Sequence, residues 1–255
     1  MADIIAKELL VIHIEISRKT TVWDFGRDLL EVFLDHDPRL KPEALYVWGD
    51  KVSDFSGLKD AKGHWAGIAQ MRSMSEFHVG LEWKRRLTTR YQAEIQHESL
   101  NIRGRLIPAT LSFYAKPHKK IDWKGFAERL YDLTEASYGF LHIHRDAHLR
   151  SDLSNAREPT WIVAERTETS VPNLGWSTFI GNEYAQYIEV EKLERSDAMT
   201  RVSDHGIAIT LSEQVMDFCD SFTAFDERRN LVKRAFTNNF FTMGGSQVGS
   251  VANIF

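Results

Sequence analysis

The chain has 255 residues, of which 43% are hydrophobic, and its formal net charge is −4. This composition excludes an intrinsically disordered chain and is typical of a globular protein. The single cysteine, Cys219, excludes an internal disulfide and favours a reducing compartment. The first apolar run is too short for a membrane span and does not resemble a secretory signal, so we expect a cytoplasmic protein that makes no membrane contact.

The charge is distributed unevenly along the chain. Residues 1–120 hold 19 Lys and Arg against 16 Asp and Glu, whereas residues 121–255 hold 13 against 20. Between Asp146 and Glu227, 16 acids face 6 bases. Direct nucleic-acid binding normally requires a basic surface, so we expect no direct nucleic-acid contact. An acidic surface would instead attract a basic protein partner, although exposed helices also carry such charges simply because they are solvated.

The first elements follow from apolar periodicity. Leu9 to Ile16 predicts a largely buried strand. Thr21, with Asp24 three residues later, predicts a capped helix that ends before Pro38. Residues 39–89 contain several Trp and Phe and predict an ordered insertion with a short strand near Tyr46.

The middle of the chain predicts a hairpin followed by a helix. Two strand-like runs, Tyr91 to Gln96 and Leu106 to Ala115, are separated by the turn-like segment from Asn101 to Gly104. Asp122 predicts an N-cap for a helix that ends at Tyr138-Gly139. A strand from Phe140 to His144 is expected next.

The second half predicts further elements of both kinds: a polar stretch at 145–158, a strand at 161–165, a helix at 183–194, a strand at 206–211, and helical stripes at 211–222 and 231–236. Because strands and helices do not alternate regularly, we expect an α+β fold with a mixed, mostly antiparallel sheet packed by helices. A single domain over residues 1–243 and a Gly/Ser-rich tail over 244–255 complete the prediction.

One segment has the residue types of a metal site, HIHRDAH at 142–148. His142 and His144 would share one face of a strand and could reach the same ion. The segment resembles the His-x-His-x-Asp-His motif of metallo-β-lactamase-like hydrolases, but Ala147 shifts His148 out of that register. We therefore expect no metal, no cofactor and no enzymatic activity. A zinc-dependent hydrolase that uses His142, His144 and His148 is the alternative.

The most distinctive segment is PNLGWSTFIGNEY at 172–184. It combines turn residues with large apolar side chains and lacks a strong nucleophile, so it predicts a structural role. Trp176 is expected to anchor the core rather than to bind a partner. The residues that form this structural motif are Gly175, Trp176, Thr178 and Phe179.

Through LGWSTF at 174–179, the chain resembles the immunity protein 52 family of bacterial polymorphic-toxin and type VI secretion systems. Members share a Gly-Trp-Thr/Ser-Tyr/Phe block within an α+β domain of about this length. The early strand–helix pair and the helix after Asp122 extend the resemblance over most of the chain.

The resemblance implies a cytoplasmic inhibitor that binds one cognate toxin, typically a restriction-endonuclease-like DNase. A nuclease presents a positive cleft, which an acidic protein can occupy or flank. A non-catalytic scaffold subunit of a secretion or phage-like assembly is a further alternative. The residues expected to contact the toxin are acids on or near predicted loops, namely Asp146, Asp152, Glu165, Glu168 and Glu183.

Overall fold

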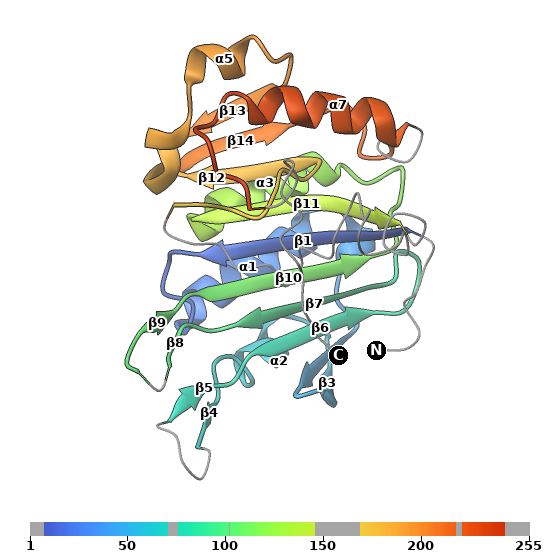
Figure 1. The fold of residues 1–255 in the computed structure, drawn as a ribbon. Coiled ribbons are helices and arrows are strands. Elements are labelled where there is room, and N and C mark those ends of the chain that lie inside the picture. Colours follow the sequence, from blue (N-terminus) through green and yellow to red (C-terminus); the bar gives the residue numbers. More distant parts are fainter. Residues whose placement is uncertain (1–7, 71–75, 102, 146–168, 218–220, 243–255) are drawn as a thin grey trace, which may run out of the picture.

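The computed structural model describes residues 8–70, 76–101, 103–145, 169–217 and 221–242. Its main feature is a ten-stranded sheet that extends from one end of the molecule to the other (Figure 1). Neighbouring strands of this sheet pair antiparallel. In their order across the sheet, the strands are β13 (Met199–Ser203), β14 (Gly206–Thr210), β12 (Ser177–Gly181), β11 (Tyr138–Arg145), β1 (Glu8–Ile16), β10 (Ala109–Ala115), β7 (Tyr91–Gln96), β6 (Leu81–Arg85), β2 (Ala44–Val47) and β3 (Asp50–Asp54).

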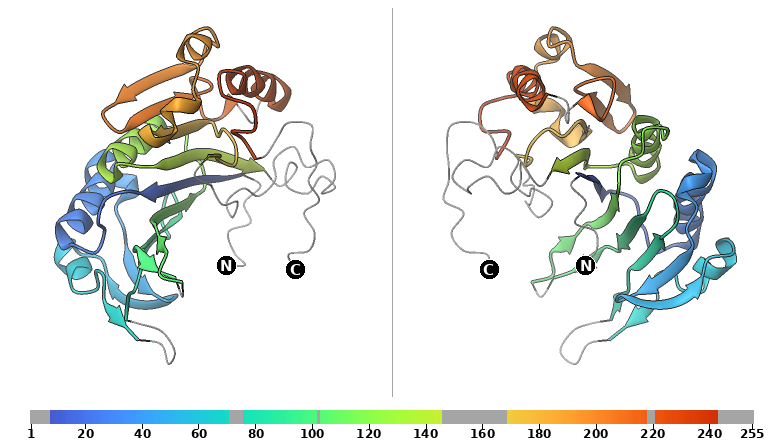
Figure 2. Two further views of the ribbon diagram at one scale, coloured as in Figure 1. Left: turned by 60° about the vertical axis from the view of Figure 1, so that its left-hand side comes forward. Right: turned by 90° about the vertical axis from the view of Figure 1, so that its right-hand side faces the viewer.

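Helices lie on both faces of the sheet, as the two views of Figure 2 show. One face is covered by α1 (Trp23–His36), α3 (Trp123–Thr134) and the short α2 (Leu58–Lys62). On the opposite face lies α7 (Phe222–Lys233), whose Phe225 ring stacks on His142 of β11 with centroids 5.6 Å apart. The smaller elements are η1 (Pro38–Leu40), η3 (Asn182–Tyr187), α5 (Val190–Glu194) and two short strand pairs, β4 (Ile68–Ala69) with β5 (Phe77–His78) and β8 (Ser99–Leu100) with β9 (Leu106–Ile107).

Phe33 of α1 lies at the centre of the core between the helices and the sheet. Its ring centroid is 5.2 Å from Trp83 on β6, 5.9 Å from Phe113 on β10 and 5.1 Å from Phe126 on α3. All four side chains are completely buried. Removing a buried ring of this kind typically costs about 3–5 kcal/mol, so this cluster fixes how α1 and α3 sit on the sheet.

Side chains alternate between the two faces along the central strands. On β10, Leu111 and Phe113 face the helices and are buried, whereas Ser112 and Tyr114 are half-buried on the other face. β7 repeats the pattern, with polar residues at every second position. The sheet therefore has an apolar face under α1 and α3 and, on β6, β7 and β10, a polar face that these helices do not cover.

The structure confirms the α+β class and the antiparallel sheet packed by helices. The strands predicted from Leu9 and from Tyr91 are β1 and β7, and the latter pairs with β10 as a hairpin. Asp122 caps α3, since its Oδ1 accepts a hydrogen bond of 2.9 Å from the backbone N–H of Gly125. These predictions hold because each rests on a local pattern.

Two predicted helix boundaries are wrong. α1 begins one residue later than expected, with Val22 at the N-cap and no side-chain hydrogen bond there, so Thr21 is not the cap. α3 ends at Thr134, and Tyr138-Gly139 opens β11 instead of ending the helix. The reason is long-range pairing, because Tyr138 lies opposite Glu15 of β1.

Two predicted helices are also revised. The helix expected at 183–194 is divided into η3 and α5, because Ile188 is extended and forms a bridge with Phe236. The stripe expected from Leu211 to Phe222 is not one helix. Leu211 lies in a bend after β14, and the helix that can be described in full, α7, starts at Phe222.

Several predictions fall outside the described residues. These are the polar stretch after Arg145, the strand at 161–165 and the tail at 244–255. Within the described part of the chain, no helix is both long and apolar enough to cross a lipid bilayer.

Candidate functional site

The Gly-Trp block is buried between β11, β12 and the segment that follows β14. Trp176 is 1% exposed, and its Nε1–H donates to Ser212 Oγ over 2.9 Å. Its carbonyl oxygen accepts from the backbone N–H of Leu211 at 2.8 Å, and the Gly175 N–H donates to Thr178 Oγ1 at 2.8 Å. The side chains of Trp176, Thr178 and Phe179 are therefore inaccessible to a partner and hold neighbouring strands together.

The two histidines of β11 lie beside this block. His142 and His144 are 0% and 1% exposed, and their ring centroids are 5.2 Å apart. The Nδ1 of His142 accepts a hydrogen bond from the backbone N–H of Trp176 at 3.2 Å. An accepting Nδ1 requires a neutral ring that carries its proton on Nε2, so both nitrogens of His142 are already assigned in this state.

This arrangement bears on the zinc alternative. Among the residues that the structure describes, no group of three or more His, Cys, Asp or Glu could hold a metal ion. His148 lies outside those residues. The site of three histidines therefore stays a prediction, and the structure places two of its members, His142 and His144. His142 could bind a metal through Nε2 only after that nitrogen loses its proton.

Of the acids predicted to contact a toxin, the structure places one. Glu183 is exposed on η3, immediately after β12. Asp146, Asp152, Glu165 and Glu168 lie outside the described residues. The predicted contact set is therefore not assembled by the part of the chain that can be described.

The polar face of the sheet carries an ordered set of side chains that the sequence analysis did not select. Glu82 and Lys84 of β6 form an ion pair of 2.9 Å. The Lys84 ammonium also lies 4.2 Å from the centroid of the Tyr46 ring, and Gln92 Nε2 donates to Glu82 Oε2 at 3.2 Å. These contacts join β2, β6 and β7 and hold the side chains in fixed positions.

The same face continues on β10 and β1. His13 Nδ1 and Ser112 Oγ are 3.2 Å apart, and Ser112 lies opposite Glu94 of β7. Burial lowers the pKa of His13 to about 4 and raises the pKa of Tyr114. Both groups are therefore neutral near pH 7, and this surface offers hydrogen-bond donors and acceptors.

A serine beside a histidine also raises the question of nucleophilic catalysis. A catalytic pair needs a base whose pKa lies near the working pH and whose other nitrogen is oriented by a third group. The pKa of His13 is far below that range. No described carboxylate bonds its second ring nitrogen. The His13–Ser112 pair therefore does not match the arrangement of a serine–histidine catalytic site. The signal that could have revealed this polar face is the polar residue at every second position of β7 and β10.

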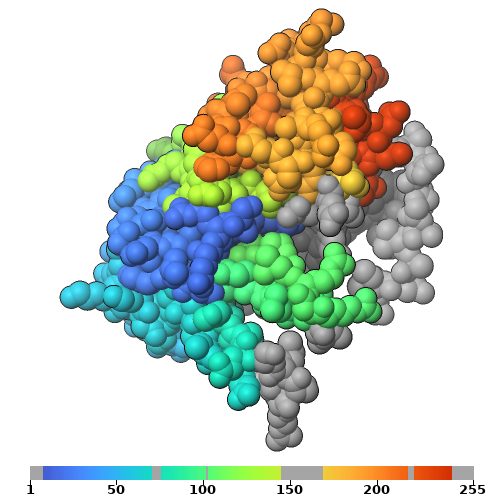
Figure 3. Space-filling model, turned by 90° about the vertical axis from the view of Figure 1, so that its left-hand side faces the viewer, coloured from blue at the N-terminus to red at the C-terminus, as the bar shows by residue number. Residues whose placement is uncertain are grey.

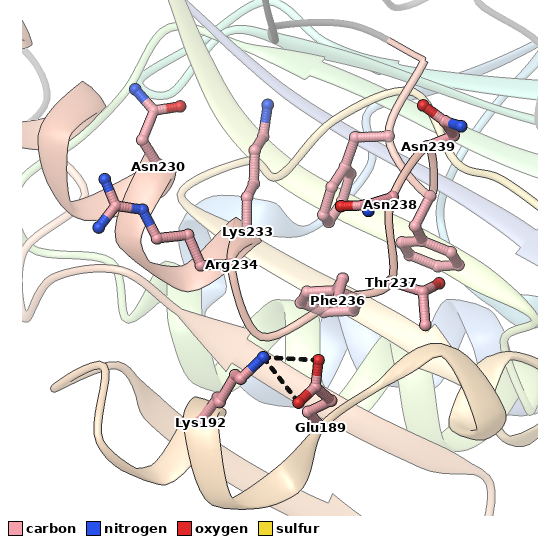
Figure 4. Close-up of a pocket in the computed structure, with 11 residues that line it drawn as sticks. Glu189, Lys192, Asn230, Lys233, Arg234, Phe236, Thr237, Asn238 and Asn239 are labelled. Carbon is pink, nitrogen blue, oxygen red and sulfur yellow. Dashed lines mark hydrogen bonds and ion pairs between the residues drawn. The ribbon is translucent and has the colours of Figure 1, made fainter.

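A second feature is an open hollow of about 800 Å³ beside the C-terminal end of α7 (Figure 4). The described residues that line it include three cationic side chains, Lys192, Lys233 and Arg234, and one carboxylate, Glu189. Lys192 forms an ion pair of 2.7 Å with Glu189. Phe236 lies in the middle of the view. The described lining residues give the hollow a net positive charge, and it is open to solvent, unlike an enclosed ligand site.

Comparison with known proteins gives a likeness in structure. No protein-family model matches the chain, and no curated protein matches it in sequence. Among solved structures, the chain is similar to the Pseudomonas aeruginosa T6SS protein PA0821, with a TM-score of 0.57 and 11% sequence identity, over 96% of this chain and 78% of the other. At this identity the likeness establishes the fold, which the two chains share over almost the whole of this one.

Proposed function

We propose that this protein is an immunity protein of a type VI secretion system, which binds a cognate toxin and neutralises it by protein–protein contact. The observation that carries the proposal is the fold shared with a T6SS protein over 96% of the chain. The resemblance of residues 174–179 to an immunity family supports the same conclusion from the sequence. The protein would act in the cytoplasm of the cell that it protects.

The surface chemistry supports binding. The polar face presents hydrogen-bonding groups on strands, where Glu82, Lys84 and Gln92 already hold one another. Side chains that are fixed before binding lose little conformational entropy when a partner docks. Such a surface suits a protein partner better than a small molecule, because it is broad and lies on a sheet.

The resemblance also suggests the class of toxin, a restriction-endonuclease-like DNase. An acidic edge would be attracted to the basic cleft of such an enzyme. Within the described residues, exposed acids follow one another along η3, which lies beside β12 and β14, and along α5, which lies beyond β13 at the end of the sheet (Figure 1). Glu183 and Glu194 are two of them, and we propose that this edge contributes to toxin capture.

A rescue and binding experiment tests the proposal. The product of the adjacent gene is expressed in a bacterial host with and without this chain, and the purified pair is run on a sizing column. Rescue of growth together with a stable co-eluting complex is the expected result. Toxicity that this chain does not relieve, or the absence of a complex, would contradict an immunity function.

A second candidate is a non-catalytic subunit of the secretion assembly, because the similar structure is named only as a T6SS protein. The same experiment separates the two candidates. A subunit would form a stable homo-oligomer or bind other components of the machinery, and it would leave toxin sensitivity unchanged.

A further inference from the structure

The end of the molecule beyond β13 combines a projecting helix with a hollow. The short helix α5 stands at the top of Figure 1, and the orange residues around it form the top of the space-filling view in Figure 3. Beside α5 lies the open hollow of about 800 Å³, whose walls include Lys192 of α5 and Arg234 at the end of α7 (Figure 4). A convex element and a concave one thus lie next to each other on the same surface.

Two exposed aliphatic side chains accompany these elements. Val190 is the first residue of α5 and is 57% exposed, and Leu231 of α7 is 50% exposed. Residues three or four positions apart share one face of a helix. Val190 therefore lies beside Glu194 on α5, and Leu231 lies beside Arg234 at the end of α7. Each element presents an apolar side chain next to a charged one, with a carboxylate on α5 and a guanidinium on α7.

These two charges are not matched within the fold. The Lys192 ammonium is paired with Glu189 at 2.7 Å, so the excess positive charge of the hollow comes from Lys233 and Arg234. Glu194 and Arg234 are both exposed, and neither forms an ion pair with another residue in the described part of the chain. The surface therefore keeps a negative charge on α5 beside a positive charge on α7.

We propose that this surface binds a second copy of the chain, so that α5 of one copy lies against the hollow and the end of α7 of the other. In a dimer with a two-fold axis, each contact occurs twice. Val190 then meets Leu231 of the second copy, and Glu194 meets Arg234. The apolar pair removes aliphatic surface from water, and the charged pair fixes the orientation of the two copies. This inference does not depend on the proposed immunity function.

The neighbouring charges of opposite sign favour this occupant over others. A basic partner attracted to Glu194 would be repelled by Lys233 and Arg234. An acidic partner or an anionic lipid surface would be attracted by those two cations and repelled by Glu194. A surface that carries both signs in the opposite order satisfies both charges, and the two-fold rotation gives a second copy this order. Because Glu194 also belongs to the acidic edge proposed for toxin capture, a bound toxin would displace the second copy.

The test measures the mass of the full chain by sedimentation velocity over a range of concentrations. The unaltered chain is expected to dimerise reversibly. Glu194→Arg and Arg234→Glu each place like charges at both contacts, so each single variant should weaken the dimer by about tenfold. The matched controls are Asp35→Arg and Arg90→Glu, which make the same changes in charge at exposed residues of the first half. Both controls should dimerise like the unaltered chain.

The reciprocal arrangement of the two charges has a test of its own. An equimolar mixture of Glu194→Arg and Arg234→Glu has opposite charges at both contacts, so it should form a heterodimer. The double variant Glu194→Arg/Arg234→Glu should form a homodimer for the same reason. A mixture that stays monomeric, or a double variant that does, would overturn the proposed docking.

A further variant tests the apolar pair. Val190→Ser/Leu231→Ser should weaken the dimer by about tenfold, because both aliphatic contacts lose their burial. The control is Ile68→Ser/Leu87→Ser, since both of those residues are 67% exposed and neither lies on α5 or α7. Unfolding midpoints are measured for all variants, and they are expected to stay near that of the unaltered chain.

Three other outcomes would overturn the proposal. The first is an unaltered chain that stays monomeric at every concentration, or a dimer that the variants and their controls weaken equally. The second is a monomeric chain whose complex with the purified product of the adjacent gene weakens in Glu194→Arg, which would assign this surface to the toxin. The third is a monomeric chain that binds phosphatidylglycerol vesicles through Arg234, so that Arg234→Glu abolishes the binding. The immunity function is decided separately, by the rescue experiment.

Discussion

The backbone N–H of Trp176 donates a hydrogen bond to Nδ1 of His142. This bond joins the two segments that stand out most in the sequence, the Gly-Trp block and the His-x-His run of β11. The bond connects the segment that leads into β12 with the neighbouring strand β11. Because Nδ1 of His142 accepts the bond, this imidazole ring must be neutral. The two segments are therefore parts of one packed unit.

The first prediction concerns the anchor of that unit. Trp176→Phe removes the hydrogen bond to Ser212 and leaves a cavity, so it should lower the free energy of unfolding by about 1–3 kcal/mol. Ser212→Ala removes only the hydrogen bond and should cost about 1 kcal/mol. Urea denaturation of both single variants and of the double variant measures the coupling. If the losses in the two single variants add up to the loss in the double variant, the 2.9 Å hydrogen bond between the two side chains contributes nothing to the free energy of unfolding.

The second prediction concerns metal. Because His142 accepts the Trp176 N–H, we expect the purified protein to contain no stoichiometric zinc, and EDTA should leave its unfolding midpoint unchanged. Elemental analysis and a thermal melt measure this. Near-stoichiometric zinc, together with a midpoint that falls on chelation, would support the hydrolase that uses His142, His144 and His148.

The central strands could be predicted from the sequence because their signal is local. Tyr91 to Gln96 alternates apolar and polar residues, and the structure makes it β7 with the same bounds. The run from Leu106 to Ala115 was predicted as one strand, but Pro108 lacks an N–H and separates β9 from β10. That break is what allows the β8–β9 hairpin to leave the main sheet.

The features that the sequence did not predict depend on distant partners. Ile188 leaves the expected helix because it bridges to Phe236, and no local pattern contains that contact. Equally, the sequence shows that Leu100 and Leu106 are apolar but not that they are exposed. The polar face was missed for a related reason, since Glu82 and Gln92 become neighbours only when β6 and β7 pair.

The third prediction compares two potential helix caps. Asp122→Ala removes the acceptor for the Gly125 N–H and should destabilise the protein by about 1 kcal/mol. Thr21→Ala is the control, because α1 has Val22 at its N-cap and no side-chain cap. Thermal unfolding should show a lower midpoint for the first variant and little change for the second. Equal shifts would contradict the assigned caps.

The fourth prediction concerns acid. Burial lowers the pKa of His13 and of His97 from 6.5 to about 4. Below pH 6.5 the unfolded chain takes up protons that the folded chain does not, so stability is complete above pH 6.5 and falls as the pH approaches 4. Each histidine can contribute at most about 3 kcal/mol of this loss.

Urea denaturation across this pH range tests the sign and the origin of the effect. His13→Gln can keep a hydrogen bond to Ser112 but cannot take up the proton, so its stability should fall less steeply. His205→Gln, at an exposed histidine, is the control and should follow the unaltered chain. A slope that is the same in all three proteins would exclude His13 as a source of the acid sensitivity.

The last prediction concerns the acidic half of the chain. If a basic toxin is captured electrostatically, Asp146→Lys/Asp152→Lys/Glu183→Lys should slow association severalfold and weaken its dependence on salt, because charge acts mainly on the on-rate. The control, Asp35→Lys/Asp50→Lys/Glu76→Lys, makes the same change in net charge at exposed acids of the first half. Stopped-flow binding at several salt concentrations distinguishes the sets. If the two triple variants slow association equally, the net charge of the protein determines the rate and the position of the acids does not. If neither variant slows association, these acids do not attract the toxin.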